Sequence, residues 1–471
     1  MRICLIAEGS FPYVAGGVSS WMTSLVSEMP EHDFIIFAIG AEEAQKGKFK
    51  CALPPNIIEV HEFFLDAHRG GKSKWGQRYS LSEQEFETLS EFLRGERTLQ
   101  WENLFKLLRS DKFKSPMDFL SSKDYFDIIE EIARDSYPTV PFTELFWTIN
   151  SMILPLLLAA RTELPEADVY HAVSTGYAGV IGALAKYLYG KPLLLTEHGI
   201  YSREREEEII KAGWVEGHFK DLWINYFYTL SAAAYTFADQ VITLFERNRE
   251  IEIELGCAPE KIDVIPNGIE SLSSVIAAVK PDSDVIRIGA IVRVVPIKDI
   301  KTMIQSFAIV EKELHNAHLY IMGPLDENPE YYDECLSLCQ ALQVQGVHFT
   351  GMVSIQEWLP KLDILLLTSI SEGQPLAILE GMAAKKPFVV TNVGSCKELM
   401  EGKESDDFGP AGIVTAVMHT EQIAKAILKL CENPKMRTVM GENGYQRVSR
   451  DYRKETFIEG YRGLYETIGG D

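Results

Sequence analysis

The stretch that most constrains the fold spans residues 363–380. A dense apolar run, Ile364–Leu367, has the length and composition of a buried parallel strand. A turn of small residues follows, with Pro375 at the expected first position of a helix whose apolar residues recur at helical spacing. This order predicts a strand, a loop and a helix of an open α/β sheet. In such sheets, ligands bind outside the carboxyl ends of the strands.

Two glutamates belong to this predicted loop and helix. Glu372 falls on the loop, and Glu380 is expected about two turns into the helix. The two carboxylates, with the backbone N–H groups between them, could hold a phosphorylated sugar. For an isolated pair of glutamates, however, a solvated loop charge and a surface helix residue are the commoner explanation. The pair therefore gains weight only from features elsewhere in the chain.

The same alternation of apolar strands and amphipathic helices recurs through most of the chain. It predicts an α/β protein of two doubly wound, Rossmann-like domains, one over residues 1–270 and one over residues 285–450. Residues 41–165 break the alternation and are predicted to form a mainly helical insertion in the first domain. A linker is expected at 271–284. A C-terminal helix at 451–471 is expected to cross back to the first domain.

Charge and cysteine content narrow the function classes. The net charge of −22 disfavours a nucleic-acid-binding surface, and no tract of Lys and Arg indicates one. Seven cysteines without metal-ligand spacing, and a first apolar segment too short for a signal peptide, indicate a reducing cytoplasm. Residues 145–160 lack charge but are too few for a spanning helix and include Asn150 and Pro155. A buried helix is expected there, with an interfacial or partner-binding helix as the alternative.

Candidate ligand-binding residues lie where predicted strands end. Gly16 and Gly17 stand at the start of the first predicted helix, where backbone can approach an anion closely. His198 follows a strand of the first domain. Arg293 and Lys298 follow the first strand of the second domain, and two cations beside a helix start suit a diphosphate. A plain turn and a structural histidine remain alternatives for the glycine pair and His198.

Other motifs are missing or weak. The chain has no glycine-rich dinucleotide fingerprint with a downstream acidic residue and no Walker A motif, so dinucleotide, kinase and ATPase sites are unsupported. Asp282-Ser283-Asp284 lies in the expected linker without a buried strand before it. A solvated segment is therefore expected there, and no metal site is predicted.

Taken as a set, the motifs resemble the signature of retaining GT-B glycosyltransferases of family 4. The resemblance rests on Arg293 with Lys298, Glu372-Gly-Gln-Pro-Leu-Ala-Ile-Leu-Glu380, the glycine pair, Thr196-Glu-His198-Gly and Pro266-Asn-Gly-Ile-Glu270. It covers both domains except the insertion, and it implies that the two domains face a cleft. The opening Ser-Phe-Pro-Tyr-Val-Ala-Gly-Gly-Val-Ser and the insertion resemble a narrower group, the cytoplasmic transferases of Pel exopolysaccharide synthesis.

The resemblance implies a role for each matched residue. Arg293 and Lys298 would neutralise the diphosphate of the leaving group. Glu372 would bind hydroxyls of the donor sugar, Glu380 those of the ribose, and His198 would face the sugar near the reacting carbon. The expected catalytic set is His198, Arg293, Lys298 and Glu372. The other implied donor contacts are Gly16, Gly17, Met352, Val353, Gly373, Gln374, Pro375, Leu376 and Glu380.

The resemblance also implies substrates and partners. A UDP-sugar donor, an oligosaccharide acceptor and an inner-membrane polysaccharide synthesis complex are expected. No metal or other cofactor is expected, because cations and a helix dipole can stabilise the departing diphosphate. Two alternatives remain: a GT-B nucleotide-sugar epimerase, and a UDP-binding regulatory subunit of a membrane synthase. Asp299 stands where the family commonly has glycine, which is expected to alter only the geometry of the helix start.

Overall fold

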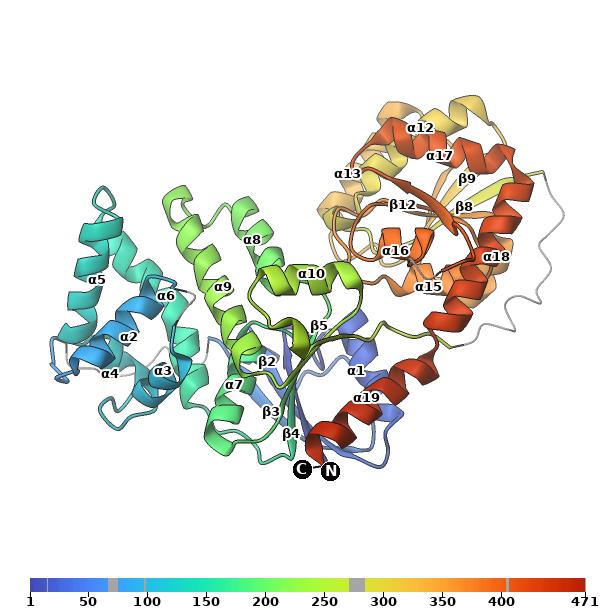
Figure 1. The fold of residues 1–471 in the computed structure, drawn as a ribbon. Helices are drawn as coiled ribbons and strands as arrows, with labels where there is room; N and C mark the ends of the chain where they lie inside the picture. Colours follow the sequence, from blue (N-terminus) through green and yellow to red (C-terminus); the bar gives the residue numbers. More distant parts are fainter. Residues whose placement is uncertain (15, 67–74, 97–98, 271–283, 404–405, 471) are drawn as a thin grey trace. The chain divides into compact units, whose positions relative to one another are not determined.

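The computed structural model describes the chain except residues 15, 67–74, 97–98, 271–283, 404–405 and 471. The described residues form two compact units, each built on a parallel sheet (Figure 1). The first unit comprises Met1–Val264 and Tyr461–Asp471, and the second comprises Ile265–Gly460. The predicted fold class, α/β with two Rossmann-like domains, is confirmed.

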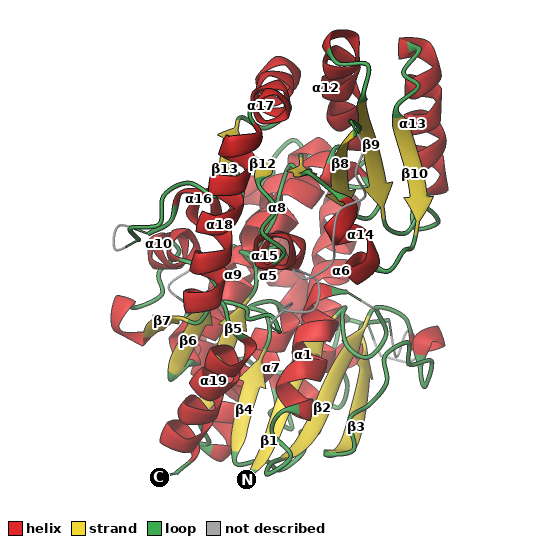
Figure 2. Cartoon of the chain, turned by 90° about the vertical axis from the view of Figure 1, so that its right-hand side faces the viewer, coloured by secondary structure: helices red, strands yellow, loops and turns green. Residues whose placement is uncertain are grey.

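The sheet of the first unit has, among described residues, seven parallel strands in the order β3-β2-β1-β4-β5-β6-β7. β2 is apolar and buried after its first residue, as expected for a strand covered on both faces. Helix α1 lies over the part of the sheet formed by β1 and β2 (Figure 2). The strands are β1 (Arg2–Glu8), β2 (Asp33–Gly40), β3 (Ile57–Phe64), β4 (Val169–Ala172), β5 (Leu193–Glu197), β6 (Gln240–Thr243) and β7 (Ile262–Val264).

Five helices of the Rossmann core of this unit connect or cover these strands. α7 is buried along most of its length and packs against β1, β4 and β5, because small residues let it approach the sheet closely. A Cβ on Gly182 would lie 2.6 Å from Leu193 of β5. The core helices among the described residues are α1 (Gly17–Ser27), α7 (Tyr177–Tyr189), α8 (Tyr201–Lys211), α9 (Lys220–Phe237) and α10 (Glu246–Glu254).

The helical insertion is shorter than predicted, because β3 lies inside the stretch 41–165 and pairs with β2 along its whole length. β3 is an edge strand with Glu59, His61 and Glu62 among its residues, so it lacks the continuous apolar run by which central strands are recognised. The described helices of the insertion are α2 (Glu83–Leu93), α3 (Trp101–Leu108), α4 (Pro116–Leu120), α5 (Lys123–Ser136) and α6 (Phe142–Arg161).

α6 is, within the described part of the chain, the one helix long and apolar enough to cross a membrane by length and composition. Half of its most apolar window is buried against the protein, and it packs on α3, α4, α5 and α7. Leu145, Ile149, Ile153 and Leu156 belong to the core of the first unit. The prediction of a buried helix at this position agrees with that packing.

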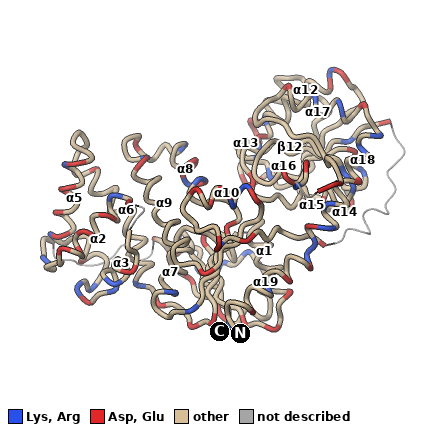
Figure 3. Tube along the Cα trace, viewed as in Figure 1, with Lys and Arg blue, Asp and Glu red and all other residues tan. Residues whose placement is uncertain are grey.

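The second unit has, in its described residues, a six-stranded parallel sheet in the order β10-β9-β8-β11-β12-β13. The strands are β8 (Ile286–Ile291), β9 (Ala317–Met322), β10 (Val347–Gly351), β11 (Ile364–Leu367), β12 (Phe388–Thr391) and β13 (Gly412–Thr415). The helices described between and after them are α12 (Ile300–Glu313), α13 (Pro329–Leu342), α14 (Ile355–Trp358), α15 (Leu376–Ala383), α16 (Cys396–Glu401), α17 (Thr420–Glu432) and α18 (Pro434–Asp451). Acidic and basic residues are interspersed over the helices of both units (Figure 3).

The chain passes between the units at two points. The first is at Val264 and Ile265, earlier than the boundary expected after residue 270, and the expected linker 271–284 lies outside the described residues except for Asp284. The second falls within the last helix, α19 (Lys454–Gly469), whose part from Tyr461 onward belongs to the first unit. Among the described residues, short 3₁₀ helices also lie in the connections, at Glu43–Gln45, Gly217–Phe219, Pro259–Lys261, Pro296–Lys298 and Leu359–Lys361.

Candidate active site

The loop after β11 carries an ion pair between two of the predicted catalytic residues. The Nζ atom of Lys298 lies 2.5 Å from Oε1 of Glu372, and the side chains are only 16% and 9% exposed. Ser369 donates its hydroxyl to the same carboxylate oxygen at 2.5 Å. The structure thus brings together a cation that ends one β-to-α connection and a carboxylate that belongs to another.

The backbone around Lys298 is fixed to the same loop. Thr368 donates its hydroxyl to the carbonyl of Lys298 at 3.0 Å, and the N–H of Ile370 bonds the carbonyl of Ile297 at 2.9 Å. Asp299 adopts a left-handed conformation with φ +48° and caps α12 by accepting the N–H of Thr302. A carboxylate cap thus accompanies the positive φ of Asp299.

The loop after β12 packs directly on the backbone of the loop that carries Glu372. Gly394 has φ +50°, and a Cβ there would lie 2.2 Å from the carbonyl oxygen of Glu372 and 2.4 Å from that of Gly373. The N–H of Ser395 bonds the Gly373 carbonyl at 3.0 Å. Glycine at position 394 is therefore required both by its conformation and by this close approach.

The predicted donor-loop residues 373–376 lead into α15. Pro375 is the residue before the helix, not its first residue as predicted, and no side chain caps the first turn. Gln374 is buried and accepts the N–H of Asn267 through Oε1 at 2.6 Å. Glu380 lies just over one turn into α15, nearer the start than predicted, and burial raises the pKa of its carboxyl. An uncapped helix start suits an anion.

Arg293 contacts a different partner from those in the Lys298–Glu372 ion pair. Its guanidinium binds Glu327 at 2.7 Å and its side chain is 52% exposed. Sequence reasoning missed Glu327, because an acidic residue in a polar loop carries no distinguishing pattern.

The two residues expected to border the base follow β10. Met352 is 76% exposed, and Val353 packs partly against the core of the second unit.

In the first unit, the start of α1 and the end of β5 carry the other predicted residues. Gly16 is the extended residue before α1, Gly17 begins the helix, and a Cβ on either would meet nothing within 4 Å. His198 directly follows β5, and the ring of Trp21 from α1 contacts its ring edge-on at a centroid distance of 4.6 Å. Burial lowers the pKa of His198 to about 4, so the imidazole is neutral at pH 7.

A buried carboxylate, Glu197, lies beside His198 and was not included in the expected catalytic set. Glu197 is fully buried and accepts hydrogen bonds from Tyr235 at 2.6 Å, from the N–H of Tyr201 at 3.0 Å and from Thr175 at 3.1 Å. Burial raises its pKa, and that of the neighbouring buried Glu252. Glu197 was visible in the sequence beside His198, but its burial among hydroxyl donors was not.

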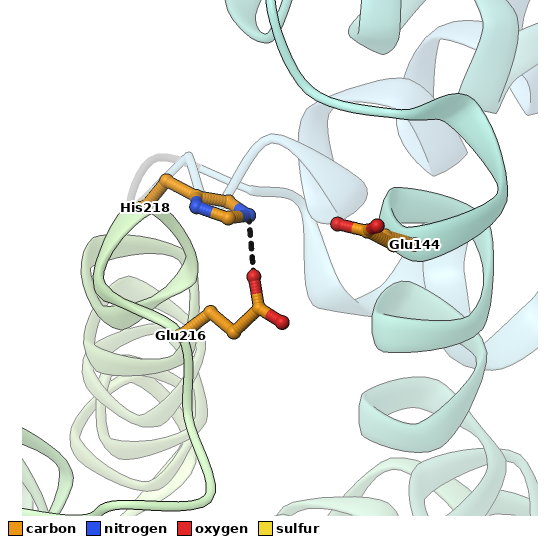
Figure 4. A group of neighbouring side chains, drawn as sticks. All are labelled: Glu144, Glu216 and His218. Atoms are coloured by element: carbon orange, nitrogen blue, oxygen red, sulfur yellow. Dashed lines mark ion pairs between the residues drawn. The ribbon is translucent and has the colours of Figure 1, made fainter.

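One exposed group of side chains has the composition of a metal site. Glu144, Glu216 and His218 bring ligand atoms within 4.8 Å of one another (Figure 4). All three are exposed, and Glu216 already pairs with His218 at 3.4 Å. Exposed acidic groups of this kind are ordinary on protein surfaces, and none of the predicted donor or catalytic residues belongs to this group.

The family models divide the chain much as the units do. The model described as a domain of unknown function (DUF3492) matches residues 1–260, more than half of the chain. The chain belongs to this family. A second model, described as glycosyl transferases group 1, matches residues 282–433, which lie in the second unit. The protein is therefore a sugar-transferring enzyme, a glycosyltransferase of the GT-B fold.

Known proteins give the same picture of the glycosyltransferase. An N,N'-diacetylbacillosaminyl-diphospho-undecaprenol α-1,3-N-acetylgalactosaminyltransferase of Campylobacter jejuni is 28% identical over 258 residues, covering 52% of this chain and 64% of the relative. The N-acetyl-α-D-glucosaminyl L-malate synthase of Bacillus anthracis is 23% identical over 351 residues, covering 70% and 85%. The crystal structure of Anabaena HepE with UDP has a TM-score of 0.61 at 16% identity, covering 99% and 100%, and shares the fold.

Proposed function

We propose that the protein is a retaining, metal-independent glycosyltransferase that moves a hexose or N-acetylhexosamine from a UDP-sugar onto a growing exopolysaccharide. The observation that carries the proposal is the ion pair between Lys298, which precedes α12, and Glu372, on the loop that leads into the uncapped start of α15. The ion pair thus brings a cation of one loop to a neighbouring loop that carries a carboxylate and a helix N-terminus. A nucleotide sugar offers the matching groups, which are a diphosphate and sugar hydroxyls.

The names of similar proteins favour particular donors. The two relatives described above are named as an N-acetylgalactosaminyltransferase and an N-acetyl-α-D-glucosaminyl L-malate synthase, and the HepE structure holds UDP. UDP-GalNAc and UDP-GlcNAc are therefore the first donors to test, followed by UDP-glucose. In this proposal Glu372 binds hydroxyls of the sugar, Glu380 binds the ribose, and the segment Met352–Val353 borders the base.

The proposed reaction exchanges one glycosidic bond for another on the same face of the sugar. The bond from the anomeric carbon to the UDP oxygen breaks as the bond to the acceptor oxygen forms, and the acceptor proton passes to the departing phosphate oxygen. Lys298 and Arg293 stabilise the negative charge that develops on UDP. This step needs no enzyme nucleophile, so Glu372 acts as a binding group. His198, neutral at pH 7, faces the sugar as a hydrogen-bonding group.

The ion pair also determines how a diphosphate would bind in the proposed site. Glu372 already neutralises the charge of Lys298, so a bound diphosphate shares that lysine with the carboxylate. Arg293 is exposed and paired with Glu327, so it exchanges this surface pair for the diphosphate when donor binds. Surface ion pairs contribute only about 0–1 kcal/mol, so the exchange at Arg293 costs little.

The resemblance to the cytoplasmic transferases of Pel exopolysaccharide synthesis, the PelF group, extends the proposal to the pathway. The opening motif before Gly16 and the helical insertion support assignment to Pel-like exopolysaccharide synthesis in the cytoplasm. An oligosaccharide is the proposed acceptor, and an inner-membrane synthesis complex is the proposed partner that exports the polymer. Affinity capture of the tagged protein from its own membranes tests this partner, with the polymer-exporting subunits expected in the eluate.

The central experiment combines binding and turnover. Calorimetry with UDP, and incubation with each UDP-sugar in buffer containing EDTA, should show binding and release of UDP. NMR of the transfer product should show the anomeric configuration of the donor. Activity that appears only on addition of a divalent cation would overturn metal independence. An epimerised UDP-sugar would favour the epimerase alternative, and failure of UDP to bind would overturn the proposal.

A further inference from the structure

The C-terminal helix places two tyrosines inside the first unit. Tyr461 and Tyr465 stand one turn apart on α19, and both are fully buried. Both belong, with His198, to the first unit. On the exposed side of the same stretch, Arg462 binds Glu31 at 2.7 Å. The last turns of α19 are thus fixed to the first unit through one buried face and one surface ion pair.

The two tyrosine hydroxyls end a chain of buried hydrogen bonds at the carboxyl ends of β4 and β5. The Tyr465 hydroxyl lies 2.6 Å from Nδ1 of His171, and Nε2 of His171 lies 2.8 Å from the hydroxyl of Thr196. The Thr196 hydroxyl in turn lies 2.9 Å from that of Tyr461. Burial lowers the pKa of His171 to about 3, so its ring is neutral and has one N–H donor and one acceptor. Both ring nitrogens of His171 are therefore satisfied by this chain.

His198 is close to this chain of hydrogen bonds through Thr196, its neighbour in sequence, and Trp21, its neighbour in space. Thr196 lies in β5, and His198 directly follows the strand, two residues further on. Trp21 packs edge-on against three rings of the group: His198 at 4.6 Å, Tyr461 at 5.4 Å and His171 at 5.9 Å between centroids. Because Trp21 contacts both Tyr461 of α19 and His198, a shift of α19 would move the Trp21 ring against His198.

The orientation of His198 depends on this packing. Its Nε2 atom is buried and has no hydrogen-bond partner among the described residues. Among the described contacts of the imidazole, the edge-on packing of the Trp21 ring is the one that restrains its orientation. Tyr461 contacts Trp21 and Thr196 directly, so it connects α19 to both neighbours of His198.

We propose that Tyr461 and Tyr465 are positioning residues that hold His198 in its working orientation through Thr196, His171 and Trp21. The inference rests on the proposed function, in which His198 faces the donor sugar. It assigns to the C-terminal helix a part in sugar transfer besides its part in folding. Removal of one hydroxyl keeps the tyrosine ring but breaks the hydrogen bond that fixes Tyr461 or His171 against Trp21.

The test uses Tyr461→Phe, Tyr465→Phe and the double variant in the full chain. Loss of a hydrogen bond in the chain should lower kcat about fivefold per variant and leave the KM for the UDP-sugar within about twofold, because the donor-binding residues lie elsewhere. Ring-labelled histidine NMR supplies a second measurement. The signals of His171 and His198, assigned with His171→Gln and His198→Gln, should shift, while those of the distant His318 and His348 should stay in place.

Arg462→Ala is the matched control, since it removes the exposed ion pair of the same helix turn. It should leave both kcat and the His198 signal unchanged. Unmoved His198 signals in the two Phe variants would overturn the proposal, as would a kcat loss equal to that of Arg462→Ala. If the wild-type protein transfers no sugar from any donor, the proposed function fails, and the histidine spectra alone then decide whether the tyrosines position His198.

Discussion

Lys298 and Glu372 form a nearly buried ion pair with a Nζ–Oε1 distance of 2.5 Å, although 74 residues separate them in the chain. The two residues follow different strands, β8 and β11, which are neighbours in the second sheet. Parallel strands bring their carboxyl ends to one edge, so adjacent strands can combine side chains from distant segments. The ion pair is therefore a direct product of the strand order.

Replacement of Lys298 by Ala should abolish most of the sugar transfer. The change removes a cation at the proposed position of developing charge and leaves the Glu372 carboxylate without its partner. We expect kcat/KM to fall by about 10²–10³-fold, the usual effect of losing one preorganised electrostatic contact. Steady-state kinetics of UDP release measures the loss.

Lys301→Ala is the control for Lys298→Ala. Lys301 lies on α12, close in sequence, and forms an exposed ion pair with Glu334 at 2.7 Å. It should retain kcat/KM within about twofold, because an exposed ion pair contributes little. Equal losses in both variants would indicate a general effect of positive charge and would contradict a specific role for Lys298.

Much of the fold could be predicted because a parallel strand that is buried on both faces has a continuous run of apolar residues in its sequence. The run Ile364–Leu367 is a strand with the bounds expected from sequence. β3 was missed because it is an edge strand whose apolar residues are interrupted by Glu59, His61 and Glu62, and it therefore resembles a loop or part of the insertion. The signal that identifies a strand weakens where one of its sides faces water.

The candidate site was predictable in its residue types and less so in its contacts. Lys298 and Glu372 were expected in one site and do form a pair, whereas Arg293 was expected beside Lys298 and binds Glu327 in this structure. The bond between His171 and Tyr465 joins residues 294 positions apart, which no local pattern reveals. Long-range contacts of this kind depend on packing, and packing is set by the whole fold.

Gly394→Ala should weaken binding of UDP. A Cβ at position 394 would overlap the carbonyl oxygens of Glu372 and Gly373, and the φ of +50° is strained for alanine. The loop that carries Glu372 must therefore move, and we expect the Kd for UDP to rise at least about tenfold, as small displacements of a positioned group commonly cost that much. Calorimetry measures the Kd, and circular dichroism checks that the fold is retained.

Gly463→Ala serves as the comparison for Gly394→Ala. Gly463 lies within α19, and a Cβ there would meet nothing within 4 Å. Alanine in a helix interior is favoured over glycine by about 0.5–1 kcal/mol, so this variant should be slightly more stable and bind UDP normally. Unchanged UDP affinity in Gly394→Ala would show that the donor loop tolerates the extra atom.

The buried pair Glu197 and Glu252 should make the first unit less stable as pH rises. Burial, and for Glu252 the nearby Glu197, raises the pKa of both carboxyls above the ordinary value of 4.5, so the folded protein retains protons that the unfolded chain releases. The sign follows from linkage: where the folded state binds more protons, the free energy of unfolding falls with increasing pH, by up to about 1.4 kcal/mol per unit for each proton. The fall should begin just above pH 4.5.

Glu252→Gln should reduce this pH dependence, because glutamine keeps the shape of the neutral carboxyl and cannot ionise. Denaturant unfolding at several pH values from 5 to 9 measures the slope in each protein. Glu250→Gln, on the exposed side of the same helix where Glu250 pairs with Arg247, should leave the slope as in the wild type. A slope that is identical in wild type and Glu252→Gln would contradict the retained proton.

Asp299 is expected to have two opposing effects on stability: its side chain strains the backbone, and its carboxylate caps α12. Its φ of +48° disfavours a side chain, while its carboxylate caps α12 by accepting the N–H of Thr302 at 3.3 Å. Asp299→Gly relieves the backbone and loses the cap, so the free energy of unfolding should change by less than about 0.5 kcal/mol. Asp299→Ala loses the cap without relieving the backbone and should cost about 1–2 kcal/mol. Urea unfolding separates the two variants, and an equal loss in both would mean that the cap alone sets the stability of this helix start.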